Sequence, residues 1–233
     1  MTRKSTPLKD ILPKLTAILA PLNEEQRTLL TRNATIQTYK KNQIIYAEDD
    51  EPTHLLCLIQ GKVKIYKDGI GGRTQIIRVI KPVDFFGYRA AFASQDYVTS
   101  AAALEQTIIV KFPLNIVTRL LQENAQLGWM FIQHLSVYLG TADQRTVSLT
   151  QKHIRGRLAE ALLSLKENYG LEEDGSTLSI YLSREDLANF SNMTTSNAIR
   201  TLSNFATEKI IAIDGRKIKL IDEERLKKIS TAG

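Results

Sequence analysis

The spacing of apolar residues along the chain changes twice, and each change marks a predicted boundary. Over roughly the first thirty residues, leucine and isoleucine recur at helical spacing. From about Ala34 to Pro113 the chain instead shows short runs rich in Ile, Val and Tyr, separated by turn residues. From Leu114 to Tyr169 the period is helical again. We therefore predict an N-terminal helix, a strand-rich domain and a helical middle.

The strand-rich region contains several apolar runs that end at turn residues: NQIIYAE, THLLCLI, KVKIYK, TQIIRVI, VTSAAALE and TIIVKF. The run KVKIYK alternates apolar and charged positions, which predicts a strand with one buried face. The run HLLCLI is apolar throughout, so we expect both of its faces to be buried. Several short strands at near-regular spacing predict a sandwich or a barrel-like roll.

An apolar seam runs along the helical middle. Its members follow a 3-4-3-7 spacing: Ile132, Leu135, Leu139, Ala142 and Leu149. A heptad seam is typical of helices that pair with each other. Phe131 and Tyr138 form a neighbouring stripe that can pack on the helix's own domain. We predict a homodimer, although a core helix of a monomer would give a similar pattern over so few heptads.

The C-terminal part predicts alternating helices and strands. HIRGRLAEALLSLKENYG predicts a helix that ends at Gly170, and LSIYL predicts a short strand. IIAIDGRKIKLI predicts a hairpin that turns at Asp214 and Gly215, because Asp-Gly favours tight hairpin turns. DEERLKKIS predicts a short terminal helix.

The stretch LSREDLANFSNMTTSNAIRTLSNF holds two helical patterns with a very short break between them. Ser183 with Asp186 resembles a capping box, and Thr194 can cap the second helix. Asn192 lies in the break, where a left-handed conformation is expected, and Asn tolerates that conformation well. Two helices joined so tightly predict a helix-turn-helix, and an ordinary helical hairpin is the alternative.

The second of these helices is predicted to have an apolar and a polar side. At about 100° per residue, the apolar side collects Ala198, Ile199, Leu202, Phe205 and Ala206. The polar side collects Ser196, Asn197, Arg200 and Asn204. Arg, Asn, Ser and Thr are the side chains that read bases in the major groove. The candidate DNA-binding residues are Ser183, Arg184, Thr194, Thr195, Ser196, Asn197, Arg200 and Lys217.

Charge and composition narrow the class of protein. The net charge is +6, but residues 151–233 contain 13 Lys and Arg against 12 Asp and Glu, so a nucleic-acid site there would be a local patch. The one cysteine, Cys57, permits neither an intrachain disulfide nor a four-thiolate iron–sulfur cluster. We expect a cytoplasmic protein without a membrane partner and without a metal site. No constellation of catalytic side chains stands out, so we do not expect an enzyme.

From about Leu15 to Ile229 the chain resembles the Crp/Fnr superfamily of bacterial transcription regulators. The resemblance rests on Ser183-Arg184-Glu185-Asp186-Leu187-Ala188, on Thr194 and on Arg200-Thr201-Leu202. It also rests on KKNQIIYAEDDEPTHLLCLIQGKVKIYKDG, FFGYRAAF and TSAAALE. It implies an α+β protein with a cyclic-nucleotide-binding-like β-roll or jelly roll (residues 1–121), a long dimerisation helix (122–150) and a winged helix-turn-helix (151–233).

The resemblance also implies partners and an effector pocket. The implied partners are double-stranded DNA with a pseudo-palindromic operator, a second copy of the chain, and RNA polymerase. The candidate pocket residues are Gly87, Tyr88, Arg89, Thr99 and Ser100. Members that bind cyclic nucleotides have Glu where this chain has Tyr88, and Arg where it has Thr99. The effector is thus expected to differ from cyclic AMP, and haem stays open. The alternative function is a cyclic-nucleotide-type or haem-type sensor module that regulates a protein partner.

Overall fold

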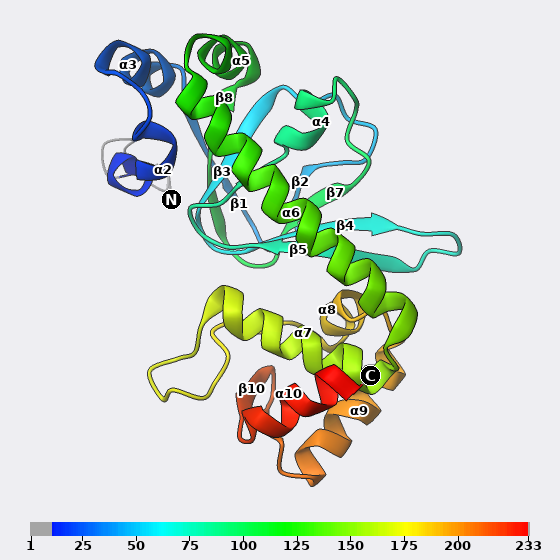
Figure 1. The fold of residues 1–233 in the computed structure, drawn as a ribbon. Coiled ribbons are helices and arrows are strands. Elements are labelled where there is room, and N and C mark those ends of the chain that lie inside the picture. Colours follow the sequence, from blue (N-terminus) through cyan, green and yellow to red (C-terminus); the bar gives the residue numbers. More distant parts are fainter. Residues whose placement is uncertain (1–10, 233) are drawn as a thin grey trace. The chain divides into compact units, whose positions relative to one another are not determined.

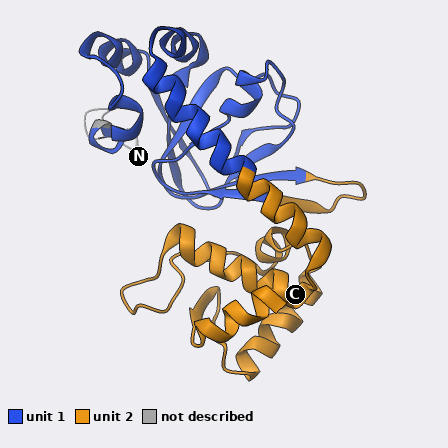
Figure 2. Cartoon of the chain, in the orientation of Figure 1, with its two compact units in different colours: residues 1–67, 77–139 blue, residues 68–76, 140–233 orange. Residues whose placement is uncertain are grey.

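A computed structural model describes residues 11–232 (Figure 1). Its contacts group the chain into two compact units, residues 1–67 with 77–139 and residues 68–76 with 140–233 (Figure 2). The boundary falls inside the long helix α6 (Ala125–Gln151). The three-part division expected from the sequence therefore stays a prediction.

Two four-stranded sheets form the strand-rich region, as the sequence predicted. Their strand orders are β1-β8-β3-β6 and β2-β7-β4-β5. The strands are β1 (Thr35–Tyr39), β2 (Ile44–Tyr46), β3 (His54–Gln60), β4 (Val63–Asp68), β5 (Thr74–Ile80), β6 (Phe85–Phe86), β7 (Ser100–Ala103) and β8 (Thr107–Pro113). Strand β3 lies between β8 and β6, and both neighbours run antiparallel to it.

Burial along the strands follows the predicted patterns. In β3 the residues from Leu55 to Ile59 are all buried, which confirms that both faces of this strand are covered. In β4 Val63 and Ile65 are buried while the residues between and after them are not. The thiol of Cys57 is 0% exposed, and burial raises its pKa, so it is held as an unreactive thiol.

Short helices cover part of the roll: η1 (Leu12–Lys14), α2 (Thr16–Leu19), α3 (Glu24–Arg32), α4 (Tyr88–Phe92) and α5 (Leu114–Glu123). Residues of the N-terminal helices, including Ile18 and Leu30, share one apolar cluster with Phe112 of β8 and with Leu127 and Phe131 of α6. This cluster is the larger of the two cores that the structure describes in the N-terminal unit.

The predicted seam of α6 divides into exposed and half-buried positions. Ile132 and Leu139 are 52% and 65% exposed, and Ala142 is also exposed. Leu135 packs partly against the core that contains Phe131, and Leu149 is half-buried. Leu135 therefore belongs to both predicted stripes, the seam and the stripe of Phe131 and Tyr138, because this turn of α6 packs on the core of the roll.

The C-terminal unit is built from α7 (Ile154–Tyr169), α8 (Arg184–Phe190), α9 (Thr195–Thr207), β9 (Ile211–Asp214), β10 (Lys217–Leu220) and α10 (Glu223–Ala232). The end of α7 before Gly170 and the β9–β10 hairpin confirm the sequence predictions. The turn residue Gly215 has φ +55°.

The strand predicted for LSIYL is wrong. The segment makes only isolated bridges, from Leu178 to Leu171 and from Thr177 to Lys219. The amide of Leu178 donates to the carbonyl of Ile218, but β10 begins at Lys217 and offers no further partners along this line. The chain then leaves toward the start of α8 without a ladder.

Gly61, between β3 and β4, yields a stability prediction. It has φ +91°, and a Cβ there would lie 2.6 Å from both the carbonyl oxygen of Gln106 and Oγ1 of Thr107. Gly71 has a similar φ of +81° but no atom within 4 Å of such a Cβ. Gly61→Ala should therefore cost about 2–5 kcal/mol of unfolding free energy, and Gly71→Ala only the ~1–2 kcal/mol of backbone strain.

Urea unfolding of the full chain, followed by circular dichroism, measures both glycine variants. Equal losses for the two variants would show that steric overlap at Gly61 adds nothing to the effect of its φ.

Candidate nucleic-acid interface and effector site

Helices α8 and α9 are joined by a turn of four residues, Ser191 to Thr194 (Figure 1). Asn192 has φ +51°, which confirms the expected left-handed turn residue. The amide of Met193 donates to the carbonyl of Ala188 at 3.0 Å, and Met193 is 3% exposed. The turn is therefore held by a backbone bond and by a buried side chain.

Both predicted N-caps form. Oγ of Ser183 accepts from the amide of Asp186 at 2.9 Å and donates to that residue's carboxylate at 2.7 Å. Oγ1 of Thr194 accepts from the amide of Asn197 at 3.3 Å. A capping side chain satisfies an amide that has no partner within the helix, so each cap fixes where its helix begins.

Helix α7 supports this motif with two arginines that the sequence analysis did not single out. Nη2 of Arg157 donates to the carbonyl of Asn192, inside the turn, at 3.0 Å. Arg155 lies over the ring of Phe205, 4.8 Å from its centroid, and binds the carboxylate of Glu208 at 2.6 Å. Only the fold could reveal these contacts, because they join positions far apart in the chain.

The buried face of α9 consists of Ala198, Thr201, Leu202 and Phe205. Thr195, Ser196, Arg200 and Asn204 are exposed, and Asn197 is half-exposed. The polar side therefore lies on the solvent face, as expected. Ile199 was assigned to the apolar side, and that assignment is wrong because this residue is 47% exposed. The buried face centres on Phe205 and Ala198. Because Ile199 follows Ala198, its side chain points about 100° further around the helix and lies outside the core.

Arg200 is held in a defined orientation on this face. Its Nη2 donates to Oδ1 of Asn197 at 2.9 Å. Because the two residues are three apart on a helix, their side chains lie on neighbouring turns of the same face. A guanidinium that is already oriented loses less conformational entropy when it binds a base edge.

Arg184, at the start of α8, contacts the turn of the β9–β10 hairpin. Its Nη2 donates to the carbonyl of Gly215 at 2.6 Å, while its buried Nη1 has no partner among the described residues. Lys217 lies 5.8 Å from the ring centroid of Tyr181. Arg184 thus contacts the turn of the hairpin, and Lys217 lies at the start of the second strand of the same hairpin.

The candidate effector residues divide between the two clusters of the roll. Tyr88 lies in the cluster shared with the helices, where its ring is 5.3 Å from that of Phe131. It is 2% exposed, its hydroxyl has no hydrogen-bond partner in the described chain, and burial raises its pKa. Gly87 instead faces the other cluster. A Cβ added at this position would lie 3.1 Å from the hydroxyl of Tyr97, which belongs to that cluster.

That second cluster contains a stacked aromatic pair. The rings of Tyr46 and Tyr97 are 3.8 Å apart and nearly parallel, and both side chains are buried. Burial raises the pKa of Tyr46, and a hydrogen bond to Thr99 opposes this rise. Oγ of Ser100 accepts from the amide of Glu48 at 3.0 Å. Each of these two hydroxyls therefore has one partner inside the protein, and the O–H of Ser100 is not used by the bond from Glu48.

Two family models match the chain. The cyclic nucleotide-binding domain covers residues 36–124, and the Crp-like helix-turn-helix domain covers residues 156–229. The chain is 23% identical, over 198 residues, to the CRP-like cAMP-activated global transcriptional regulator of Mycobacterium tuberculosis, covering 84% of this chain and 88% of that protein. It is 25% identical over 188 residues to the anaerobic regulatory protein of Bacillus subtilis, covering 80% and 79%.

The fold is similar to that of FixK2 from Bradyrhizobium japonicum, with a TM-score of 0.78 and 24% identity, covering 86% of this chain and 98% of that one. The chain belongs to the Crp/Fnr family. It is a transcription regulator with a cyclic-nucleotide-binding-like domain and a Crp-like helix-turn-helix, and its role is non-enzymatic.

At the two positions where cyclic-nucleotide-binding members carry Glu and Arg, this Crp/Fnr protein has Tyr88 and Thr99. A cyclic phosphate inside the roll needs a fixed cation, because an unpaired buried anion is very costly. Thr99 supplies no charge, and the side chain of Arg89 is exposed. The hydroxyl of Tyr88 is neutral, so it cannot accept the charge-assisted hydrogen bonds that a carboxylate would accept from ribose hydroxyls. Moving Tyr88 out of its aromatic cluster would also expose apolar surface.

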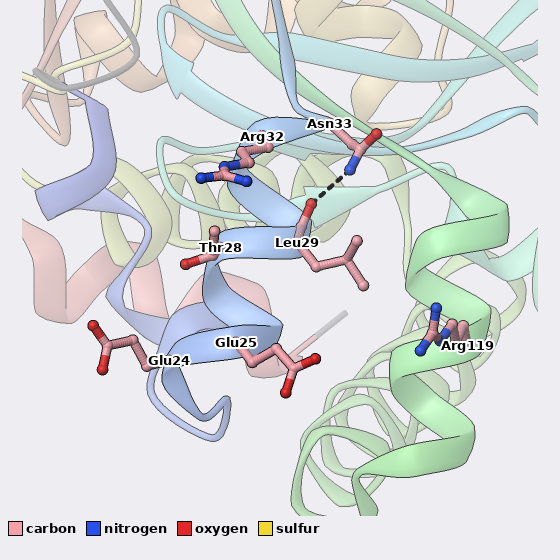
Figure 3. A pocket seen from close by; sticks show the side chains of 7 residues that line it. All are labelled: Glu24, Glu25, Thr28, Leu29, Arg32, Asn33 and Arg119. Atoms are coloured by element: carbon pink, nitrogen blue, oxygen red, sulfur yellow. Dashed lines mark hydrogen bonds between the residues drawn. The ribbon is translucent and has the colours of Figure 1, made fainter.

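A separate surface cavity of about 360 Å³ lies between α3 and α5 (Figure 3). Its lining includes Glu24, Glu25, Arg32 and Arg119 but none of the predicted effector residues. Arg119 binds Glu123 at 2.8 Å, so its charge is already paired. Because acidic and basic groups line the same exposed hollow, it selects no class of ligand.

Within residues 11–232, no group of three or more His, Cys, Asp or Glu side chains is arranged to hold a metal ion. In the same part of the chain, no helix is long and apolar enough to cross a membrane.

Proposed function

We propose that this Crp/Fnr regulator works as a homodimer that places α9 of each copy in the major groove of a pseudo-palindromic operator. The observation that carries the proposal is the oriented polar face of α9, where Asn197 holds Arg200 opposite a buried apolar face. Ser196 and Thr195 would hydrogen-bond to base edges, while Thr194, Arg184 and Lys217 would contact phosphates. The hydroxyl of Ser183 already donates to Asp186 and would instead position the first turn of α8. RNA polymerase is the proposed protein partner, and the cytoplasm the proposed location.

The exposed apolar positions of α6 support dimerisation. Ile132, Leu139 and Ala142 face solvent along one line of the helix, with Leu135 and Leu149 half-buried beside them. Trp129 and Val147, 60% and 52% exposed, flank this line. A contiguous apolar stripe of this kind is typical of an interface, and pairing two copies would remove it from water.

The proposed effector is a ligand other than cyclic AMP or cyclic GMP. The relative from Mycobacterium tuberculosis is described as activated by cAMP. In this chain, the stacked Tyr46 and Tyr97 occupy the cluster next to Gly87, Thr99 bonds to Tyr46, and Ser100 accepts from the amide of Glu48. These contacts support a changed or lost nucleotide specificity.

Arg200→Ala tests the proposed readout. It should weaken binding to the preferred operator by ~1–3 kcal/mol and relax the preference at one base pair of each half-site, because Arg pairs bidentately with guanine. Arg184→Ala is the matched comparison and should weaken operator and scrambled duplex alike, with a reduced salt slope. Fluorescence anisotropy over a salt series measures both. Full operator discrimination by Arg200→Ala would remove this residue from the readout.

Exposed seam residues of α6 test the dimer. Ile132→Asp with Leu139→Asp should give monomers in sedimentation experiments and weak operator binding, because two carboxylates would be buried in the interface. The control is Val137→Asp, which places a carboxylate on the opposite side of α6 at a position that is 68% exposed. A wild-type protein that is monomeric at micromolar concentration would refute the proposed assembly.

Calorimetric titration tests the proposed loss of nucleotide binding. Neither cyclic AMP nor cyclic GMP should bind more tightly than about millimolar, a free energy of ~4 kcal/mol, since Thr99 supplies no fixed cation for the phosphate. Micromolar binding by either nucleotide would contradict the proposal. In that event Arg89→Ala identifies whether Arg89 is the substitute cation.

A further inference from the structure

Ile199 is an apolar residue on the solvent face of α9. Its side chain is 47% exposed, whereas Ala198, Leu202 and Phe205 of the same helix are at most 1% exposed. Thr195 and Ser203, four residues before and after Ile199, are also exposed. Ile199 therefore lies in a row of small polar side chains rather than at the margin of another apolar patch.

Exposure alone does not make Ile199 a site, because single exposed apolar residues are common on protein surfaces. Its position is what matters. It directly precedes Arg200, whose guanidinium is oriented by Asn197 at 2.9 Å. The cap at Thr194 and the buried face of α9 fix the rotation of the helix. The side chains of Ile199 and Arg200 therefore project in fixed, neighbouring directions.

The major groove presents one apolar group, the C5-methyl of thymine, among donors and acceptors. An isoleucine can accept no hydrogen bond and pays a cost against a polar base edge, but it gains by covering a methyl group. A β-branched side chain also has one strongly preferred rotamer on a helix, so it loses little freedom on contact. The matching base for Ile199 is therefore thymine.

We propose that Ile199 reads the C5-methyl of a thymine neighbouring the base pair that Arg200 contacts, so that each half-site contains a guanine next to a methyl-dependent position. The inference rests on the proposed insertion of α9 into the major groove. It adds a specificity determinant that works by covering a methyl group, whereas the polar residues of α9 work by hydrogen bonds.

The test uses the full-length protein and needs no knowledge of its target genes. A preferred operator is first selected from a pool of random duplexes. Each thymine is then replaced by deoxyuridine, which pairs identically with adenine but lacks the methyl group. For the wild-type protein, one position per half-site should respond, with affinity falling about fourfold per site, or about 15-fold when both half-sites are changed.

Protein variants assign the effect. Ile199→Ala should bind the thymine operator more weakly by a similar factor and should not distinguish it from the uracil operator. Ile199→Val keeps the branched side chain and should retain most of the uracil response. The control is Ile221→Ala, an isoleucine 52% exposed outside α9, which should respond to uracil as the wild type does.

The outcomes separate this inference from the proposed function. If no sequence is enriched in the selection, operator binding itself fails. If an operator is found but uracil is tolerated at every position, the methyl contact is refuted. The same holds if Ile199→Ala loses as much affinity on uracil substitution as the wild type, because another group must then contact the methyl.

Discussion

The burial of one face of α9 is the constraint on which the candidate DNA-binding surface depends. Ala198, Leu202 and Phe205 can all be removed from water only at one rotation of the helix. That rotation turns Ser196 and Arg200 outward. The cap at Thr194 fixes where the helix begins, and Arg157 holds the preceding turn through the carbonyl of Asn192. The polar surface is thus positioned by apolar packing and backbone bonds rather than by polar contacts of its own.

The roll uses the same principle with a different result. Tyr88 faces the helix-side core, where rings of Phe92 and Phe131 surround it, although it follows the glycine that begins α4. Tyr46 and Tyr97 stack in the other cluster. These aromatic rings fill the space between the elements of the roll and stabilise it by packing, although the buried hydroxyl of Tyr88 has no partner among the described residues. The domain thus keeps the family's architecture, and its aromatic packing is the basis for proposing a changed nucleotide specificity.

Much of this arrangement could be predicted from the sequence because it follows local rules. Strand alternation, the Asp214-Gly215 turn, the caps at Ser183 and Thr194 and the left-handed Asn192 all depend on near neighbours in the chain. The sequence predictions failed where contacts with residues distant in the chain determine the structure. The strand expected for LSIYL lacks a neighbour beyond Lys217, and the position of Ile199 depends on where α7 and α8 centre the buried face. The contacts of Arg184 with Gly215 and of Thr99 with Tyr46 join residues far apart, so no local pattern marks them.

The distribution of charge explains why such a protein would need two copies and close base contacts. Many cations of the C-terminal unit are already paired: Arg155 and Arg225 with Glu208, Lys166 with Glu223, and Lys219 with Asp174. These pairs lower the pKa of Glu208 and Glu223, so both carboxylates stay ionised and offset part of the positive charge of this unit. Non-specific attraction to phosphates should therefore be modest. In the proposed dimer, affinity would come from doubling the contacts and from base contacts such as the one proposed for Arg200. Each base contact would then carry a larger share of the binding energy than it would on a strongly basic surface.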